Sequence, residues 1–242
     1  MVVLPERTWG DAAASGRALL VHGLSSESDS WWRIAEALAE EGWHVTAVDL
    51  RGHGAAPRAD SYRLEDYAAD LPDGWDLVIG HSLGGAGAVL AAQRQGFAGR
   101  LVLIDPVLHV PEADEAEIIA DQVAELDLTP DSIARAKPHW HERDRAAKLS
   151  GVRRVDPDAV TRTFTDTGRW DVTEQARALE VPALILSGDP AVYTMLDPGL
   201  GRSLPADYVV IEGAGHSPHR DRPEQTLAAL RAWLTTGRGS RP

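Results

Sequence analysis

A serine surrounded by glycines lies where an apolar segment gives way to an alanine-rich one. The sequence GHSLG at residues 80–84 follows a predicted strand at 76–80 and precedes a predicted helix at 83–95. A serine on such a sharp strand-to-helix turn has a strained backbone, and only small residues fit two positions to either side. The turn lifts the hydroxyl above a sheet, beside helix amides that attract negative charge. This context predicts that Ser82 is a nucleophile.

A serine hydroxyl is a weak nucleophile until a base takes its proton, so a histidine is expected close to it. The sequence has nine histidines. His216 follows the predicted strand at 208–213 in a glycine-rich loop and precedes the last predicted helix at 223–234. His219 is an alternative further along this loop, whereas the His81 side chain is expected to point away from the hydroxyl. We therefore predict that His216 is the base.

Negative charge that develops on a reacting carbonyl oxygen needs two backbone donors. The amide of Leu83, directly after the serine, is the first candidate. The loop after the predicted strand at 17–23 offers the second, and we assign it to the amide of Leu24. Gly23 is small enough to let this backbone approach the serine, and His22 and Gly23 are also expected to contact the substrate.

Short apolar segments alternate with segments of helical spacing along most of the chain. Apolar runs predict strands at 17–23, 43–50, 76–80, 100–105, 182–188 and 208–213. Helical spacing predicts helices at 30–42, 64–71, 83–95 and 223–234. Strands this apolar are buried on both faces. The alternation therefore predicts an α/β fold, with a mostly parallel central sheet and helices on both of its faces.

Residues 106–178 interrupt this alternation. They contain charged, helix-like stretches and no convincing strand, and they lie between the predicted strands at 100–105 and 182–188. We interpret them as a helical insertion over the strand ends, with residues 1–105 and 179–242 forming the core. Acidic residues from 112 to 121 are expected to face solvent and to disfavour strongly anionic substrates. The tail from Thr235 is expected to fray.

The charge composition of the sequence indicates which classes of binding partner are unfavourable. The 242 residues include 24 lysines and arginines against 37 aspartates and glutamates, a formal net charge of −13. This excess of negative charge argues against binding of nucleic acid or of anionic membranes. No signal peptide or membrane-spanning apolar run is evident, so we expect a cytoplasmic protein. The sequence leaves the oligomeric state open.

Composition also limits the chemistry. The sequence has no cysteine, which excludes disulfides, thiolate zinc sites and a cysteine nucleophile. His139 and His141 are spaced so that they would point to different faces of a helix, so they do not suggest a metal site. We therefore expect neither a metal nor another cofactor.

Five motifs in this order resemble the α/β-hydrolase superfamily over nearly the whole chain. They are LLVHG at 19–23, DLRGHG at 49–54, GHSLGG at 80–85, VPALILSGD at 181–189 and GAGHSPHRDRPE at 213–224. The resemblance implies a serine, an acid and a histidine in this chain order. It also implies a cap domain at 106–178 and an architectural role for His53.

The sequence departs from the family pattern at the acid. Relatives usually carry it shortly after the glycine that ends the penultimate strand, at a position that here is Ala191. Asp189, directly after Gly188, is one candidate. Asp105, at the end of an earlier predicted strand as in some superfamily members, is the other. Either carboxylate could hold the histidine tautomer and stabilise its cation, and the sequence leaves the choice open.

Aromatic side chains indicate the character of the substrate pocket. Trp140 and Trp170 belong to the predicted cap, as do His141 and Phe164, and Trp32 follows the predicted oxyanion loop. Rings placed over the serine would suit a small hydrophobic acyl or alcohol group. Packing of the cap against the core is the alternative role for each of them.

The expected function is hydrolysis of a small-molecule carboxylic ester or lactone through an acyl-enzyme. Ser82 would attack the carbonyl, and His216 would take its proton and later return it to the leaving group. The same scaffold supports C–C bond hydrolysis, acyl transfer and lyase chemistry. A ligand-binding protein without turnover is the alternative outside enzymes.

Overall fold

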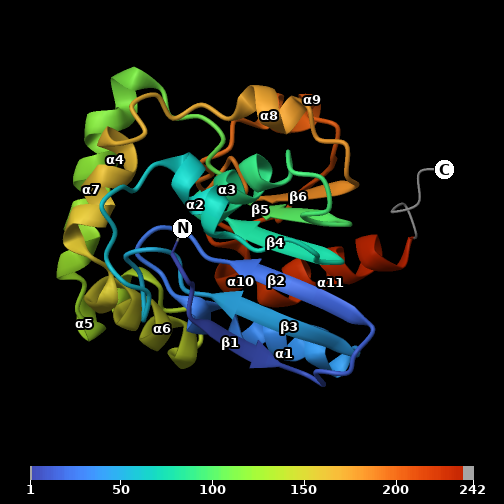
Figure 1. Cartoon of the computed structure of the whole chain (residues 1–242). Helices are drawn as coiled ribbons and strands as arrows, with labels where there is room; N and C mark the ends of the chain where they lie inside the picture. Colours follow the sequence, from blue (N-terminus) through green and yellow to red (C-terminus); the bar gives the residue numbers. More distant parts are fainter. Residues whose placement is uncertain (1, 237–242) are drawn as a thin grey trace.

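The computed structural model describes residues 2–236, in which seven strands form one sheet (Figure 1). The strand order is β1-β3-β2-β4-β5-β6-β7. β1 pairs antiparallel to β3, and every other neighbouring pair is parallel, so the predicted mostly parallel sheet is confirmed. The strands are β1 (Glu6–Trp9), β2 (Gly16–Val21), β3 (Trp43–Val48), β4 (Leu77–His81), β5 (Leu101–Ile104), β6 (Ala183–Ser187) and β7 (Asp207–Val210).

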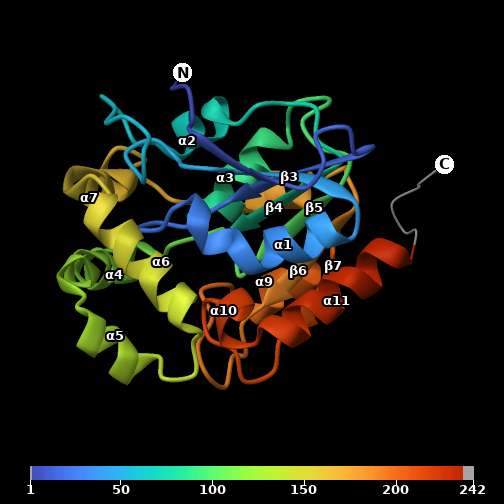
Figure 2. The same ribbon diagram turned by 90° about the horizontal axis from the view of Figure 1, so that it is seen from below.

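Each face of the sheet has its own apolar core, because side chains alternate along a strand. In β2, Leu19 and Val21 join one cluster, and Ala18 and Leu20 join the other. The first cluster includes α2 (Leu64–Asp70) and α3 (Leu83–Ala91), and the second includes α1 (Trp32–Glu40) and α11 (Pro223–Thr235). Figure 2 shows α1 and α11 packed side by side. Helices on both faces explain why the central strands are apolar throughout.

The chain leaves the sheet after β5 and returns to it at β6. The intervening helices are α4 (Glu112–Ala124), α5 (Pro130–Ala136), α6 (Glu142–Arg154), α7 (Pro157–Thr165) and α8 (Thr173–Arg177). Figure 1 shows α4 to α7 grouped beyond the ends of the parallel strands. Within this insertion the structure has an isolated bridge between His109 and Asp171 but no strand among the described residues. The division into a core and a separate cap domain stays a prediction.

Several elements differ from the sequence-based expectations. β1 is not predicted, because its residues are mostly exposed and lack an apolar run. The helix expected at 30–42 begins as a 3-10 turn at Ser28–Trp31, and the helix expected at 83–95 ends at Ala91. The remaining short helices are η2 (Glu125–Asp127), α9 (Pro198–Ser203) and α10 (Pro218–Asp221).

Two further expectations concern the C-terminal tail and membrane-spanning segments. Thr235, where the tail expected to fray begins, is the last residue of α11. The part of this tail after residue 236 lies outside the described residues. Within residues 2–236, no helix combines the length and the apolar character that crossing a membrane requires.

Candidate active site

The turn at Ser82 is as tight as its flanking glycines predict. Ser82 alone connects β4 to α3, with a φ of 53° and a ψ of −120° that are unusual for a residue with a side chain. A Cβ atom on Gly80 would lie 2.5 Å from the carbonyl oxygen of Gly84. A Cβ atom on Gly84 would lie 2.3 Å from the carbonyl oxygen of Val21. Both positions therefore require glycine.

Ser82, His216 and Asp105 form a continuous hydrogen-bonded chain. The Ser82 hydroxyl lies 3.0 Å from Nε2 of His216, and Nδ1 of His216 lies 2.6 Å from Oδ2 of Asp105. An ionised carboxylate only accepts, so Nδ1 carries the ring proton and Nε2 can accept from the serine. The sheet places Ser82 and Asp105 side by side, because they directly follow the paired residues His81 and Ile104.

Asp105 is fully buried and held by several donors. Its Oδ1 accepts the amide of Gly188 at 3.0 Å and the hydroxyl of Thr194, and its Oδ2 accepts the amide of Met195 at 3.0 Å. Burial alone would raise the pKa of Asp105, but the hydrogen bonds from His216, Thr194 and Met195 hold it below its ordinary value. Asp105 therefore presents a negative charge to the His216 ring at neutral pH.

The other candidate acid, Asp189, is used differently. Its carboxylate accepts the backbone amides of Gly213 at 2.8 Å and Ala191 at 2.9 Å, and these hydrogen bonds lower the pKa of Asp189. In the described part of the chain, no hydrogen bond or ion pair joins Asp189 to His216. Asp189 thus ties together two loops at the sheet edge, which is ordinary aspartate turn chemistry.

The two predicted oxyanion donors lie next to the serine. Leu83 is the first residue of α3, and Leu24 follows β2; both residues line the same cavity as Ser82. Neither backbone amide has a hydrogen-bond partner among residues 2–236. A Cβ atom on Gly23 would lie 2.9 Å from Cβ of Ser82, so glycine lets this loop approach closely. Two available amides, one at a helix N-terminus, suit a developing negative charge.

Two further histidines, His81 and His219, lie near His216, and their rings contact each other at 4.8 Å. Nε2 of His81 donates to the His216 carbonyl oxygen at 2.8 Å, and the two rings lie 4.9 Å apart. His219 is buried and stacks on Trp31 at 5.0 Å, so the structure does not bring it to Ser82. Burial lowers the pKa of His81 and of His219 well below the ordinary value. Both rings are therefore neutral, and His81 helps to hold the loop that carries His216.

His22 is buried next to Gly23 and does not line the cavity. Its Nε2 accepts the amide of Leu50 at 3.0 Å, so Nδ1 donates to the Gly23 carbonyl oxygen at 2.7 Å. Contrary to expectation, neither His22 nor Gly23 is among the residues that line the cavity. His53 is also buried, with Nδ1 bonded to the Arg51 carbonyl oxygen at 2.8 Å, and burial lowers its pKa to about 3.

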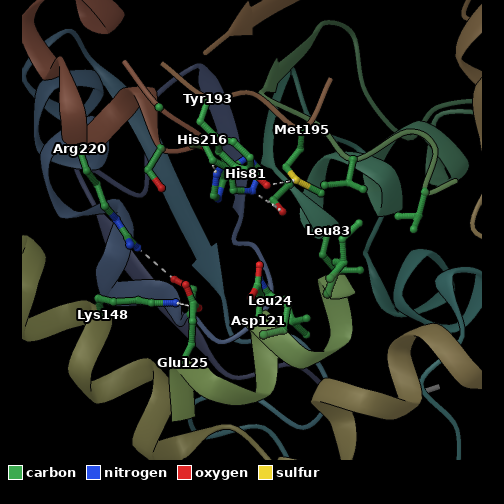
Figure 3. A pocket seen from close by; sticks show the side chains of 18 of the residues that line it. Leu24, His81, Leu83, Asp121, Glu125, Lys148, Tyr193, Met195, His216 and Arg220 are labelled. Atoms are coloured by element: carbon green, nitrogen blue, oxygen red, sulfur yellow. Dashed lines mark hydrogen bonds and ion pairs between the residues drawn. The ribbon is translucent and has the colours of Figure 1, made fainter. Parts of the chain in front are cut away.

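A cavity of about 370 Å³ opens in front of Ser82 and His216. Its lining includes apolar, uncharged polar and charged side chains. The apolar residues include Val107, Val110, Ile118, Phe164, Trp170 and Met195, and the charged residues are Asp121, Glu125, Lys137, Lys148 and Arg220. Figure 3 shows Leu83 and Met195 on one side, Arg220, Lys148 and Glu125 on the other, and His216 between them.

The predicted pocket aromatics divide into two groups. Trp140 and Trp170 line the cavity, as does Phe164. Trp32 does not, contrary to expectation: its indole Nε1 donates to Asp144 at 2.8 Å, and its ring lies 5.2 Å from His141. Trp32 and His141 therefore form a contact between α1 and the start of α6, and neither side chain lines the cavity.

His139 and His141, the two histidines considered for a metal site, bind different partners. Nε2 of His139 lies 2.9 Å from Oδ1 of Asp221, and Nδ1 of His141 accepts the amide of Arg143 at 3.1 Å. Across residues 2–236, no group of three or more His, Cys, Asp or Glu side chains is arranged to hold a metal ion.

Several cavity residues were not singled out from the sequence. Tyr193 is 55% exposed, yet its ring lies 6.4 Å from the His216 ring. Met195 lines the cavity and its amide also donates to Asp105. Both belong to the loop after β6, whose departure from the family pattern was the available signal. Arg220 lies within the same motif as His216, at 213–224, and a single arginine there gives no signal of a binding role from the sequence.

Comparison with known proteins agrees with this geometry. The sequence pattern of the alpha/beta hydrolase family matches residues 18–230. Lipase LipV of Mycobacterium tuberculosis is 33% identical over 254 residues, covering 90% of this chain and 93% of its own. Esterase YbfF of Escherichia coli is 29% identical over 237 residues, covering 89% and 92%. A solved thermophilic esterase from Thermogutta terrifontis, with malate bound, has a TM-score of 0.76 at 27% identity, covering 97% and 94%. This chain therefore belongs to the alpha/beta hydrolase family.

Proposed function

We propose that this chain is a serine hydrolase that cleaves a small carboxylic ester or lactone through an acyl-enzyme. The observation that carries the proposal is the unbroken chain from the Ser82 hydroxyl through the His216 ring to the buried Asp105 carboxylate. The similarity to an esterase and a lipase over most of the chain supports the same reaction class.

The first step is attack by Ser82 on the substrate carbonyl carbon. Nε2 of His216 takes the hydroxyl proton as the new C–O bond forms, and the ring becomes a cation. Asp105 is already ionised and hydrogen-bonded to Nδ1, so it stabilises that cation without moving. Proton transfer by a positioned base contributes about 10²–10⁴-fold to such rates.

The carbonyl oxygen becomes negative in this step. The amides of Leu24 and Leu83, which have no partner among the described residues, are the donors that we assign to it. Loss of one such donor typically slows turnover by about 10²–10³-fold. His216 then gives its proton to the leaving alcohol, the C–O bond to that alcohol breaks, and the acyl group stays on Ser82. Water, deprotonated by His216, releases the acid and restores the serine.

A substrate panel tests this proposal. p-Nitrophenyl butyrate and a set of γ- and δ-lactones would be incubated with the wild-type protein, Ser82→Ala and His216→Ala. We expect hydrolysis by wild type and a loss of at least about 10³-fold in kcat for both variants, since removal of either group disables the nucleophile. The relative rates on esters and lactones assign the substrate class.

Ser203→Ala is the matched control. Ser203 is an exposed serine of α9 whose hydroxyl donates to the Leu200 carbonyl oxygen at 2.7 Å, outside the cavity. We expect it to keep wild-type rates. Turnover by a folded Ser82→Ala variant within tenfold of wild type would reject the assigned nucleophile. A folded wild-type protein that hydrolyses no ester or lactone would favour the non-catalytic binding alternative.

A further inference from the structure

One cation that lines the cavity has no ion pair among the described residues. Arg220 lies on α10, in the segment that follows His216, and only 5% of its surface is exposed. Its Nη2 donates to the hydroxyl of Ser26 at 3.1 Å, and its guanidinium carbon lies 5.1 Å from the centre of the Trp140 ring. Nε and Nη1 have no hydrogen-bond partner within residues 2–236. The cavity therefore contains a buried cation that the protein itself leaves incompletely satisfied.

The carboxylates around Arg220 are already used by other groups. Asp144, Glu125 and Asp221 attract its charge, but none forms an ion pair with it. Glu125 pairs with Lys148. Asp144 binds the indole of Trp32 and the guanidinium of Arg33. Asp221 has four partners, which are Trp140, His139, Lys137 and the Gly215 amide. None of these three carboxylates is therefore free to neutralise Arg220.

A buried charge without a close partner is unfavourable, because it has lost water and gained little in return. Burial lowers the pKa of Arg220, which is the direction expected for a cation in that position. An anion in the cavity would supply the missing partner. A planar guanidinium matches a carboxylate in particular, since its donors can meet both oxygens.

We propose that Arg220 binds a carboxylate of the substrate, which makes the substrate an ester with a free acid group away from the bond that is cleaved. This inference rests on the proposed function, because it places the acid group in the cavity that Ser82 and His216 line. Arg220 lies across the cavity from Met195, with His216 between them (Figure 3). The substrate therefore has a charged end at Arg220 and an apolar end toward Met195.

The other charges of the cavity limit this acid group to one negative charge. Lys148 is paired with Glu125 at 2.5 Å, and Lys137 lies 3.6 Å from Asp221, so Arg220 is the cavity cation without an ion pair in the described residues. A single carboxylate neutralises it. A dianionic phosphate would also meet the negative charges of Asp121 and Glu125, which line the same cavity. The acidic residues thus disfavour strongly anionic substrates, as the sequence suggested, while a monoanion fits.

Two matched ester pairs test this inference on either side of the cleaved bond. Mono-p-nitrophenyl glutarate and its methyl ester differ only in a free carboxylate on the acyl side. 4-Butanoyloxybenzoate and its methyl ester differ in the same way on the alcohol side. We expect wild type to prefer the charged member of at least one pair by at least tenfold in kcat/KM, mainly through KM. Arg220→Met is expected to reduce that preference at least tenfold, and Arg220→Lys to keep part of it.

Arg231→Met is the matched control, because Arg231 is an exposed arginine that pairs with Glu41 outside the cavity. It is expected to keep the wild-type preference. The inference would be overturned if wild type and Arg220→Met showed the same preference, or if wild type preferred neither charged ester. Hydrolysis of the neutral esters in that case would leave the proposed function intact. If no ester is hydrolysed, the proposed function itself fails.

Binding supplies a readout that does not depend on turnover or on the folding of Arg220→Met. Pentanoate and pentanamide have similar shapes and differ in charge, and their binding to wild type would be measured by calorimetry. We expect pentanoate to bind at least tenfold more tightly than pentanamide, with the difference reduced in Arg220→Lys. Equal affinity of the two probes for wild type would contradict a carboxylate site at Arg220.

Discussion

For single residues, the sequence predicts that Ser82 and His216 act together, and the structure brings these two side chains together, whereas the sequence does not decide between two aspartates. Ser82 and His216 lie in short motifs whose local backbone carries the signal, namely flanking glycines and a glycine-rich loop. Asp105 and Asp189 both follow strands and both precede a proline, so local sequence does not separate them. Only the pairing of β4 with β5 reveals that Asp105 lies beside Ser82.

Replacement of each aspartate separates their roles. We expect Asp105→Asn to lower kcat/KM by about 10³–10⁴-fold, because the amide cannot stabilise the His216 cation and favours the wrong tautomer. Asp189→Asn is expected to stay within about threefold of wild type in kcat/KM, since Asp189 binds only backbone amides. Steady-state kinetics on p-nitrophenyl butyrate measure both. Equal losses in the two variants would contradict the assignment of Asp105.

At the scale of elements, the apolar runs and helical spacings predicted the sheet and the helices that flank it. The exposed edge strand β1 was missed because its residues are not buried on either face. The sequence predicts helices rather than strands at 106–178, but the contribution of this stretch to the cavity depends on how its helices pack. That packing explains why Trp140 and Trp170 reach the cavity while Trp32 is held by Asp144.

Two glycines of α3 test the turn that positions the serine. A Cβ atom on Gly84 would lie 2.3 Å from the Val21 oxygen, whereas one on Gly87 would lie 3.9 Å from Cβ of Tyr67, an ordinary contact. We expect Gly84→Ala to lower the free energy of unfolding by at least about 2 kcal/mol and to reduce turnover, because the helix must shift. Gly87→Ala is expected to raise the free energy of unfolding by up to about 1 kcal/mol, because alanine favours the helix more than glycine does. Urea unfolding of the two variants measures the contrast, and similar effects would contradict it.

At the scale of the whole molecule, the buried polar groups create a pH dependence that the sequence did not indicate. His22, His53, His81 and His219 are buried, and burial lowers the pKa of each. Below the unfolded-state pKa of about 6.5, the unfolded chain binds protons that the native state does not. The stabilisation from these rings is therefore complete above that pH and is lost as the pH falls toward the native-state values.

Urea unfolding at two pH values tests this dependence. Each such histidine lowers the free energy of unfolding by about 1 kcal/mol between pH 7.5 and pH 5.5, so we expect a loss of at least about 2 kcal/mol for the whole chain. Between pH 7.5 and pH 8.5 the four rings are neutral in both states and should contribute no change. Equal stability at pH 7.5 and 5.5 would show that these rings do not remain neutral in the native state.

If His216 and Asp105 activate Ser82 as a nucleophile, its hydroxyl should react covalently with an electrophilic probe. A fluorophosphonate reacts with an activated serine hydroxyl, and mass spectrometry locates the adduct. We predict one adduct on wild type, on the peptide that contains Ser82, and none on Ser82→Ala. We also predict labelling at least about 10³-fold slower in His216→Ala, which lacks the base. A folded wild-type protein that stays unlabelled, or carries the adduct on another serine, would contradict the account.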